Sequence, residues 1–414
     1  MDGGRGRRTL STDTAVEDLL RDLAPRVVGV LARRSGDFTA AEDAAQEALV
    51  AAYTTWPRDG IPDRPRAWLV TAASRRLVDE QRSESARRRR EQEWVAAEPA
   101  GAGVVQQDDT LTVLLMCCHP VLTPASAVAL TLRAVGGLTT AEVAAAYAVP
   151  EATMATRISR AKRQVRDSGE RFSLPPDDEL GERVTRVLRV LYLLYNEGYV
   201  ATSGSGLTRT DLSTEAIRLA RTAHRLLPAD REATALLALL LLLDARRPAR
   251  LTASGEVVPL SEQDRSLWDH ALVTEGTALL DSTLGTGPLG AYQVQAAIAA
   301  VHDRATRAQD TEWPQVLALY GLLEQVSPSP FVTLARAVAL AEVEGPDAAA
   351  PLVDEVAGRL GDHHRVSAVR GHLAELGGDP ASARRHYLEA ARRTANLAEQ
   401  QHLTTRAARL AGDA

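Results

Sequence analysis

The sequence predicts an all-α protein built from several domains. Hydrophobic residues make up 45% of the chain and aromatic residues only 4%, so its cores must consist of leucine, valine and alanine, which favours closely packed helices. Apolar residues recur at helical spacing along most of the sequence, and no segment has the sustained alternation of a strand. A chain of 414 residues exceeds the roughly 100–200 residues typical of one domain, so we expect two to four.

Charge and cysteine content restrict the class of protein further. The formal net charge of −6, taken alone, argues against a nucleic-acid-binding protein, but a whole-chain average hides segregated charge. The two cysteines, Cys117 and Cys118, are adjacent, which argues against a disulfide framework and favours a reducing compartment. No apolar leader follows the first arginines, and no apolar run reaches the roughly 18 residues of a membrane span. We therefore predict a cytoplasmic protein.

Breaks rich in proline and glycine divide the helical pattern into units. The predicted organisation, in chain order, is a disordered N-terminus at 1–13, a helical domain at 14–93, a linker at 94–108, a small helical domain at 109–170 and a helical C-terminal domain at 171–414. The linker is acidic, with Glu98 and Asp108 within it and Asp109 at its end.

The first informative helix is predicted over 39–56. Thr39 and Glu42 have the spacing of a capping box, in which each side chain satisfies a backbone N–H at the helix start. Asp43 and Glu47 lie one turn apart and form an acidic patch suited to a basic partner. The apolar positions that share the buried face of this helix are Ala45, Leu49, Ala52 and Trp56.

A basic segment follows at 65–90. Seven arginines lie between Arg75 and Arg90, against three acidic residues. Trp68 and Trp94 flank them, and interleaved aromatic and basic side chains suit single-stranded or melted nucleic acid, on which bases stack. The alternative is a solvated helix end with a disordered basic tail at 87–90, and this segment alone does not exclude it.

The strongest local pattern lies at 137–166 and predicts a helix-turn-helix. Thr139 and Glu142 form a capping box at the start of a first helix, which runs to about Tyr147. The short turn at 148–150 follows, and Pro150 suits the first turn of a second helix because an N–H is not needed there.

The second helix of this motif has one apolar face and one basic face. The apolar positions recur at helical spacing and must be buried: Met154, Ile158, Ala161 and Val165. The opposite face holds Ala152, Thr153, Thr156, Ser159, Arg160 and Arg163, flanked by Arg157 and Lys162. Small side chains allow close approach to a groove and arginines reach phosphates or guanine edges, so we predict DNA binding here. The alternative is an ordinary amphipathic helix with a solvated basic face.

The C-terminal domain shows weak internal repetition. The small–small–large–small spacing of a tetratricopeptide second helix occurs at Gly378, Ala383, Tyr387 and Ala390. A similar phase recurs at Ala216, Ala220, Ala223 and Pro228, and at Val316, Tyr320, Leu323 and Pro328. Gly345 and Gly378 are 33 positions apart, close to the ~34-residue period of that repeat. We predict tetratricopeptide-like packing, with an irregular helical bundle as the alternative.

These segments together resemble bacterial extracytoplasmic-function sigma factors of the sigma-70 family, in the subgroup with a tetratricopeptide-like C-terminal extension. Residues 39–56 are similar to the region 2 helix that docks on the polymerase clamp, 65–82 to the segment that melts and captures the minus-10 element, and 137–166 to region 4, which reads the minus-35 element. Similar subgroup sequences lie at 114–144, 192–199, 244–251, 264–272 and 291–302.

The resemblance implies functional residues on each segment. Core polymerase is bound by Asp43, Gln46 and Glu47. The minus-10 element is contacted by Trp68, Arg75, Arg76, Asp79 and Arg82, although Arg75 stands where many members have asparagine. The minus-35 element is contacted by Thr153, Thr156, Arg157, Ser159, Arg160, Lys162 and Arg163.

The partners implied by the resemblance are core RNA polymerase, through its clamp and flap regions, and promoter DNA, without a membrane. It further implies a non-catalytic initiation factor without a cofactor, whose acidic linker threads the polymerase near the RNA path. The C-terminal domain then acts in cis, as a regulator or a scaffold that contacts the sigma domains.

Several residues invite other assignments. Cys117, Cys118 and His119 are consecutive, whereas zinc sites use spaced pairs, so we expect buried thiols and no metal. His363, His364 and His372 lack a surrounding metal motif and are expected to be solvated or capping residues. Residues 196–206 contain neither a phosphate-binding glycine pattern nor a nucleophile elbow.

Two rival functions remain at the level of the sequence. One is a conventional helix-turn-helix regulator that binds duplex DNA without polymerase and senses a ligand through its C-terminal domain. It leaves the acidic helix at 39–56 and the basic segment at 65–90 unexplained. The other is an enzyme fused to a DNA-binding domain, for which the C-terminal sequence offers no catalytic constellation.

Overall fold

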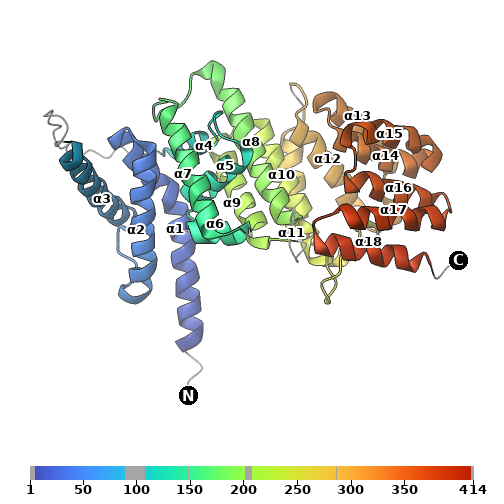
Figure 1. Ribbon diagram of the computed structural model, residues 1–414, viewed down its shortest axis with the longest axis horizontal. Helices are drawn as coiled ribbons and strands as arrows, with labels where there is room; N and C mark the ends of the chain where they lie inside the picture. Colours follow the sequence, from blue (N-terminus) through green and yellow to red (C-terminus); the bar gives the residue numbers. More distant parts are fainter. Residues whose placement is uncertain (1–4, 89–107, 148, 201–207, 286, 412–414) are drawn as a thin grey trace. The chain divides into compact units, whose positions relative to one another are not determined.

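The computed structural model describes residues 5–88, 108–147, 149–200, 208–285 and 287–411 (Figure 1), with side chains at 5–14 and 79–88 left undescribed. Within these ranges the chain forms eighteen α-helices and no β-sheet, apart from one isolated bridge between Leu251 and Val257. The expected all-α fold class is confirmed.

The chain divides into two compact units, residues 1–191 and 192–414. The division falls within helix α8 (Asp177–Tyr199). Both predicted sigma domains lie in the first unit, and most of the predicted C-terminal domain lies in the second. The predicted linker at 94–108 lies outside the described residues except for Asp108.

The first unit contains seven helices before α8. They are α1 (Arg5–Ser35), α2 (Phe38–Asp59), α3 (Pro65–Arg88), α4 (Thr110–Cys117), α5 (Pro124–Ala134), α6 (Thr140–Ala146) and α7 (Glu151–Asp167). Helices α1, α2 and α3 pack against one another, α5, α6 and α7 form a second cluster, and α1 also contacts α4 and α5. The first unit therefore holds its two helical clusters against each other.

The N-terminal part departs from expectation at two places. Residues 1–13 were expected to be disordered, whereas α1 is assigned from Arg5. Asp109 was placed at the end of an acidic linker, but it is the N-cap residue of α4 and is only 7% exposed. It pairs with Arg33 of α1 at 2.7 Å, because a buried carboxylate needs a cationic partner.

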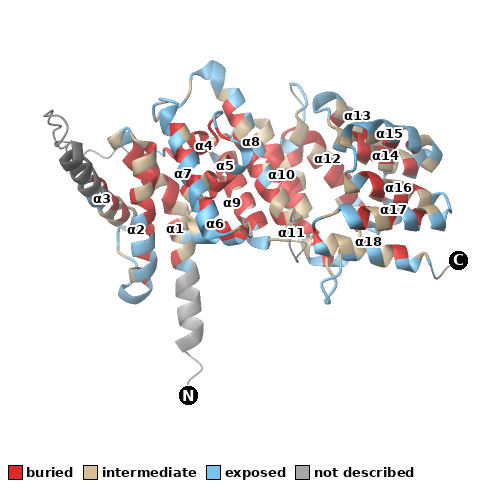
Figure 2. Cartoon of the chain, in the orientation of Figure 1, coloured by how far each residue is buried: buried red, intermediate tan, exposed pale blue. Residues whose placement is uncertain are grey.

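The second unit begins with the C-terminal part of α8 and continues through ten further helices. They are α9 (Thr210–Leu226), α10 (Arg231–Ala245), α11 (His270–Ser282), α12 (Ala291–Arg304), α13 (Trp313–Val326), α14 (Pro330–Glu344), α15 (Pro346–Leu360), α16 (His364–Leu376), α17 (Pro380–Arg393) and α18 (Leu397–Arg409). Helix α10 is buried almost all round (Figure 2), as its leucine run requires.

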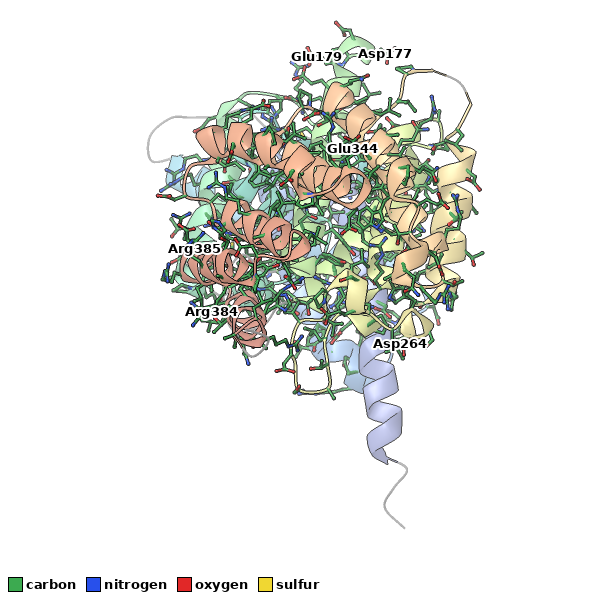
Figure 3. All side chains as sticks on the ribbon, turned by 90° about the vertical axis from the view of Figure 1, so that its right-hand side faces the viewer. Asp177, Glu179, Asp264, Glu344, Arg384 and Arg385 are labelled. Carbon is green, nitrogen blue, oxygen red and sulfur yellow. The ribbon has the colours of Figure 1, made fainter. Side chains whose placement is uncertain are left out.

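Helices α14 to α17 repeat one structural unit. Ala349 and Ala383 are both 0% exposed and lie 34 positions apart, as do the buried Val353 and Tyr387. Gly371 of α16 lies under the Tyr387 ring, where an added Cβ would come within 2.8 Å of the ring carbons. This spacing and this close approach are those of the predicted tetratricopeptide-like packing. The outer side of α17 is basic, with Arg384 and Arg385 at the surface in Figure 3.

Candidate DNA and polymerase interfaces

The helix-turn-helix forms as the sequence predicts. Helix α6 begins with a capping box, in which the Thr139 N–H donates to Glu142 Oε2 at 2.7 Å and the Glu142 N–H donates to Thr139 Oγ1 at 3.2 Å. Pro150 is the N-cap of α7, one position before the first turn in which it was expected. Met154, Ile158, Ala161 and Val165 are all buried. Their burial determines which side of α7 faces outward.

The outer face of α7 is exposed and polar. Its N-terminal half presents small side chains and its C-terminal half presents arginines, with no acidic residue between Arg157 and Arg166. The exposed residues among those expected to contact DNA are Thr153, Thr156, Ser159, Arg160 and Arg163, and Arg157 is half-buried. A face of this kind approaches a groove closely at one end and reaches phosphates or guanine edges at the other.

Lys162 departs from this pattern. It was expected to flank the outer face, but it is only 5% exposed. Its ammonium pairs with the Glu42 carboxylate and lies 2.6 Å from Asp43 Oδ1, both on α2. Helix α2 covers the edge of α7 on which Lys162 lies, an effect that no periodicity within α7 could indicate.

Helix α2 begins differently from the expectation. The N-cap is Asp37, whose Oδ1 accepts from the Thr39 N–H at 2.8 Å and the Ala40 N–H at 3.0 Å. The expected capping box of Thr39 and Glu42 is therefore wrong, since Glu42 is 0% exposed and is used elsewhere. The expected buried face is confirmed, with Ala45, Leu49, Ala52 and Trp56 all at most 5% exposed.

The expected polymerase-binding residues of α2 have unequal exposure. The Glu47 side chain is 56% exposed and pairs with Arg76 Nε of α3 at 2.9 Å. The Asp43 side chain is half exposed and is held by Lys162. Gln46 is only 4% exposed, and its Nε2 donates to the Arg133 carbonyl at 2.6 Å. In this conformation Glu47 is the most accessible of the three.

Helix α3 presents part of the expected minus-10 surface. Trp68 packs edge-on against Trp56, with ring centroids 5.5 Å apart, and is half-buried. Arg75 and Arg76 are exposed. Asp79 and Arg82 belong to α3, but their side chains lie outside the described residues.

Two functional candidates were missed by the sequence reasoning. Glu42 and Arg133 form a buried ion pair of 2.9 Å between α2 and α5. A signal for Glu42 was present, because it precedes Ala45 and Leu49 by three and seven positions and so lies on their buried face. Arg133 carried no comparable signal.

The cysteine and histidine candidates are buried or have partners within the protein. Both thiols are free and buried, as expected. Burial raises the pKa of Cys118 to about 12 and raises that of Cys117 well above its usual value. His119 pairs with Glu170, and His363 caps α16 as its N-cap residue. Among the described residues no group of three or more histidine, cysteine or carboxylate side chains could hold a metal ion.

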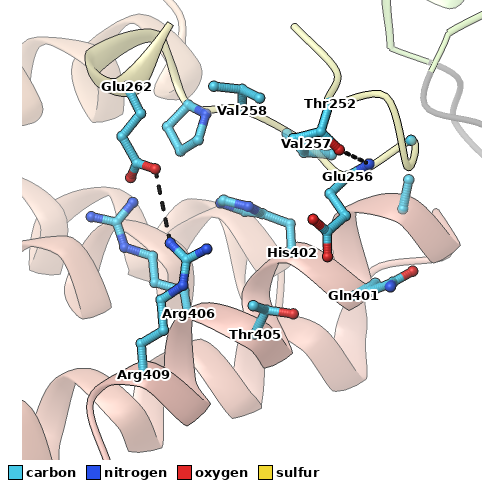
Figure 4. A pocket seen from close by; sticks show the side chains of 13 residues that line it. Thr252, Glu256, Val257, Val258, Glu262, Gln401, His402, Thr405, Arg406 and Arg409 are labelled. Atoms are coloured by element: carbon cyan, nitrogen blue, oxygen red, sulfur yellow. Dashed lines mark hydrogen bonds and ion pairs between the residues drawn. The ribbon is translucent and has the colours of Figure 1, made fainter.

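The second unit contains cavities of very different size. One of about 90 Å³ lies between α18 and the segment at 252–262 (Figure 4), where Arg409 pairs with Glu262 at 3.9 Å. Another, of about 610 Å³, is lined by Arg265, His302, Trp313 and Tyr320 together with neighbouring residues. This larger cavity has the volume of a ligand-binding site.

The geometry of the first unit defines a class of protein, a helical DNA-binding factor. It combines the helix-turn-helix of α6 and α7 with the basic and aromatic helix α3, which lies beside the acidic residues of α2. Comparison with known families identifies that class. Residues 19–87 match sigma-70 region 2, residues 112–165 match sigma-70 region 4, and residues 183–284 match a family of unknown function, DUF6596. An uncharacterized protein of Rhizobium meliloti (strain 1021) is 38% identical over 412 residues, which covers 97% of each chain.

The chain belongs to the sigma-70 family, as a sigma factor of the extracytoplasmic-function type with an additional helical C-terminal domain. Regions 2 and 4 of that family act in promoter-specific transcription initiation, so the partners of this chain are core RNA polymerase and promoter DNA. Among the described helices none is both long and apolar enough to cross a membrane.

Proposed function

We propose that the outer face of α7 reads the minus-35 element of a promoter. The observation that carries this proposal is the division of α7 into two faces. Its apolar face is buried, and its exposed face is polar and basic, with no acidic residue between Arg157 and Arg166. Thr153 and Thr156 leave room for close approach to the major groove, and Arg160 and Arg163 extend from the next turns toward bases and phosphates. The basic charge of this face matters because binding to DNA depends largely on the attraction between arginine or lysine side chains and the phosphates.

We further propose that α2 and α3 supply the polymerase and minus-10 contacts. The exposed carboxylate of Glu47 suits a basic surface on the clamp. The exposed guanidinium groups of Arg75 and Arg76 suit the backbone of a melted strand, with Trp68 beside them as an aromatic surface. Asp43 and Gln46 contribute to the clamp contact once they are accessible.

The C-terminal domain, in this proposal, regulates or scaffolds the sigma domains in cis. Its stacked helix pairs form extended surfaces of the kind that bind peptides or other proteins. The cavity of about 610 Å³, with aromatic, histidine and arginine side chains in its wall, supports a binding role for this domain.

Reconstitution tests the proposal directly. The full chain is added to sigma-free core polymerase, and transcripts are sought from a library of candidate promoter fragments. Polymerase-dependent initiation with protection at both promoter elements is the expected result. Tight binding to duplex DNA by the protein alone, without initiation in the presence of polymerase, would contradict it and favour a conventional helix-turn-helix regulator.

A further inference from the structure

The cavity of about 610 Å³ in the second unit takes no part in the contacts assigned above to regions 2 and 4. Its wall is formed by the segment at 260–267, the end of α12, the segment at 308–311, and helices α13, α14 and α16. All of these belong to residues 192–414. The volume is in the range of sites that enclose one small organic molecule.

Arg265 places a buried positive charge in this wall. It is only 8% exposed, and among the described residues no carboxylate oxygen lies within 4.0 Å of its guanidinium nitrogens. The neighbouring buried carboxylate of Asp303 is paired with Arg246 at 2.7 Å. Asp310 is paired with Arg307 at the surface, at 3.0 Å. A guanidinium group does not lose its proton in a protein, so one buried charge is left without a counter-charge, which is costly.

One edge of the Arg265 guanidinium group remains for a ligand. Its Nη1 donates to the carbonyls of His302 and Ala305, the latter at 2.6 Å. Its Nη2 makes one long contact of 3.5 Å with Thr311 Oγ1, and its Nε has no hydrogen-bond partner among the described residues. Nε and Nη2 form the same edge of the planar group, and such an edge can donate to both oxygens of a carboxylate. Trp268 lies against the face of the group, with its ring centroid 4.8 Å from Cζ.

The rest of the wall combines aromatic rings with unused polar groups. Among the described residues, the His302 imidazole, the Trp313 indole N–H and the Tyr320 hydroxyl make no hydrogen bond. Burial lowers the pKa of His302 to about 4, so its ring is neutral at pH 7. Trp313 and Tyr320 are seven positions apart on α13 and lie on the same side of it. Ala335 and Val338 of α14 add apolar surface. Such a wall suits a flat apolar body with few polar substituents.

The charges of the wall favour a ligand with a single negative charge. Besides Arg265, the described residues of the wall include one acidic side chain, Glu342 of α14, which lies 3.6 Å from His372 Nε2. Burial lowers the pKa of His372, so this histidine does not supply a full positive charge at neutral pH. One guanidinium group and one carboxylate suit a monoanion. Nucleotides, polyphosphates and acidic peptides bring two or more negative charges and are disfavoured.

We propose that this cavity binds a small aromatic carboxylate, with its two oxygens on the Nε–Nη2 edge of Arg265 and its ring against Trp313 and Tyr320. The bound carboxylate supplies the counter-charge that Arg265 lacks, and it stabilises the second unit because it binds only the folded chain. The inference rests on the binding role proposed above for the C-terminal domain, and through that role the ligand alters initiation.

Acids compared with their primary amides test the site on the full chain without any substitution. The probes are benzoate, phenylacetate, indole-3-acetate and 2-naphthoate at millimolar concentration, and binding is measured by titration calorimetry and thermal unfolding. An acid and its amide have nearly the same shape and differ in charge. At least one acid is expected to bind about tenfold or more tightly than its amide and to raise the Tm of the second unit by ~2 °C or more.

Substitutions locate the bound acid. Arg265→Gln removes the charge and weakens binding of the acid about tenfold or more, whereas Arg265→Lys keeps the charge without the two-donor edge and weakens it less. Trp313→Phe abolishes the change in tryptophan fluorescence that the acid causes. Arg304→Gln is the matched control, because Arg304 is an exposed arginine at the end of α12 outside the cavity wall, and it leaves the affinity unchanged. Urea unfolding checks that each variant folds, and the acid–amide comparison in wild type decides the matter if Arg265→Gln does not.

The functional consequence is measured as transcript yield with core polymerase, with and without the acid that binds most tightly. A severalfold change is expected for wild type and for Arg304→Gln, and none for Arg265→Gln. The site is overturned if no acid binds, if acids and amides bind equally, or if folded Arg265→Gln binds as tightly as Arg304→Gln. Binding without any change in yield would overturn the effect on initiation. A chain that binds the acid but never initiates contradicts the proposed sigma function and not the site.

Discussion

At the scale of single residues, the environment of a side chain decides its role more than its position along a helix. Arg160 and Lys162 are two residues apart on α7, yet Arg160 is exposed whereas Lys162 is buried against α2. Periodicity within α7 separates the apolar face from the polar one, and it does so correctly. It does not reveal which part of the polar face a neighbouring helix covers.

Arg160→Ala tests base recognition. If its guanidinium contacts a base edge, promoter affinity falls by about 1–3 kcal/mol and the preference at one position relaxes. A phosphate contact instead lowers affinity evenly across sequences and reduces the salt dependence of binding. Binding to a set of single-position promoter variants at several salt concentrations distinguishes these results. Arg189→Ala, an exposed arginine on α8, is the matched control and leaves binding unchanged.

His302 predicts a pH dependence of the second unit. Burial lowers its pKa to about 4, and the guanidinium groups of Arg246 and Arg265 add to this effect. Between pH 6.5 and pH 4 the unfolded chain therefore binds a proton that the folded chain does not, so stability falls as the pH falls. The expected loss is about 1–3 kcal/mol by pH 4.

Calorimetry of wild type and His302→Gln across this pH range measures the effect. The variant lacks the titrating group, so its stability falls less between pH 6.5 and pH 4. Buried carboxyls with raised pKa values, such as Asp303, act in the opposite direction and are common to both proteins. Parallel stability profiles for the two proteins would refute the assignment to His302.

At the scale of helices, caps and close approaches explain most of the local structure. The capping box of α6 and the buried faces of α2 and α7 follow from sequence spacing, because their determinants lie within one or two helical turns. The start of α2 was mispredicted for the opposite reason. Glu42 has capping spacing from Thr39 but is held by two cations from α5 and α7, and these contacts arise only in the folded chain.

The α16–α17 contact predicts opposite outcomes for two glycine substitutions. Gly371→Ala places a Cβ about 2.8 Å from the Tyr387 ring, and such overpacking costs about 1–3 kcal/mol. Gly358→Ala is the matched control, since a Cβ at that position in α15 meets nothing within 4 Å. It should be neutral or stabilise by up to ~1 kcal/mol through helix propensity. Urea unfolding of each variant provides the comparison, and equal destabilisation would argue against the close approach of α16 and α17.

At the scale of the whole chain, the fold class and the order of the sigma regions were predictable, whereas the contact between regions was not. Helical periodicity and motif spacing predict the fold class and the order of the regions. The contact between the regions depends on Glu42, Arg133 and Lys162, which are far apart in sequence and meet only through tertiary packing. The repeat of the second unit was visible in part, because Gly345 and Gly378 lie 33 positions apart. That Ala349 and Val353 correspond to Ala383 and Tyr387 follows from their burial in the folded chain.

Removing the C-terminal domain tests its role in cis, and the structure determines where to cut. Glu170 pairs with His119 and with Arg183 of α8, so a chain that ends at residue 169 loses contacts within the first unit. A stop after Leu191 retains them. If the second unit regulates in cis, this truncation changes promoter-dependent transcript yield severalfold. Unchanged yield, with intact binding to core polymerase, would exclude that role.

The 34-residue spacing between α14–α15 and α16–α17 also has an evolutionary consequence. In stacked repeats each helix pair contacts chiefly its neighbours. Excision of residues 346–379 would join Gly345 to Pro380, so that α17 follows α14 with Ala383 and Tyr387 in the register of Ala349 and Val353. Duplication of the same segment would be equally compatible with that register. The packing register of the C-terminal domain therefore allows the loss or gain of one whole helix pair without a change in the sigma regions that precede it.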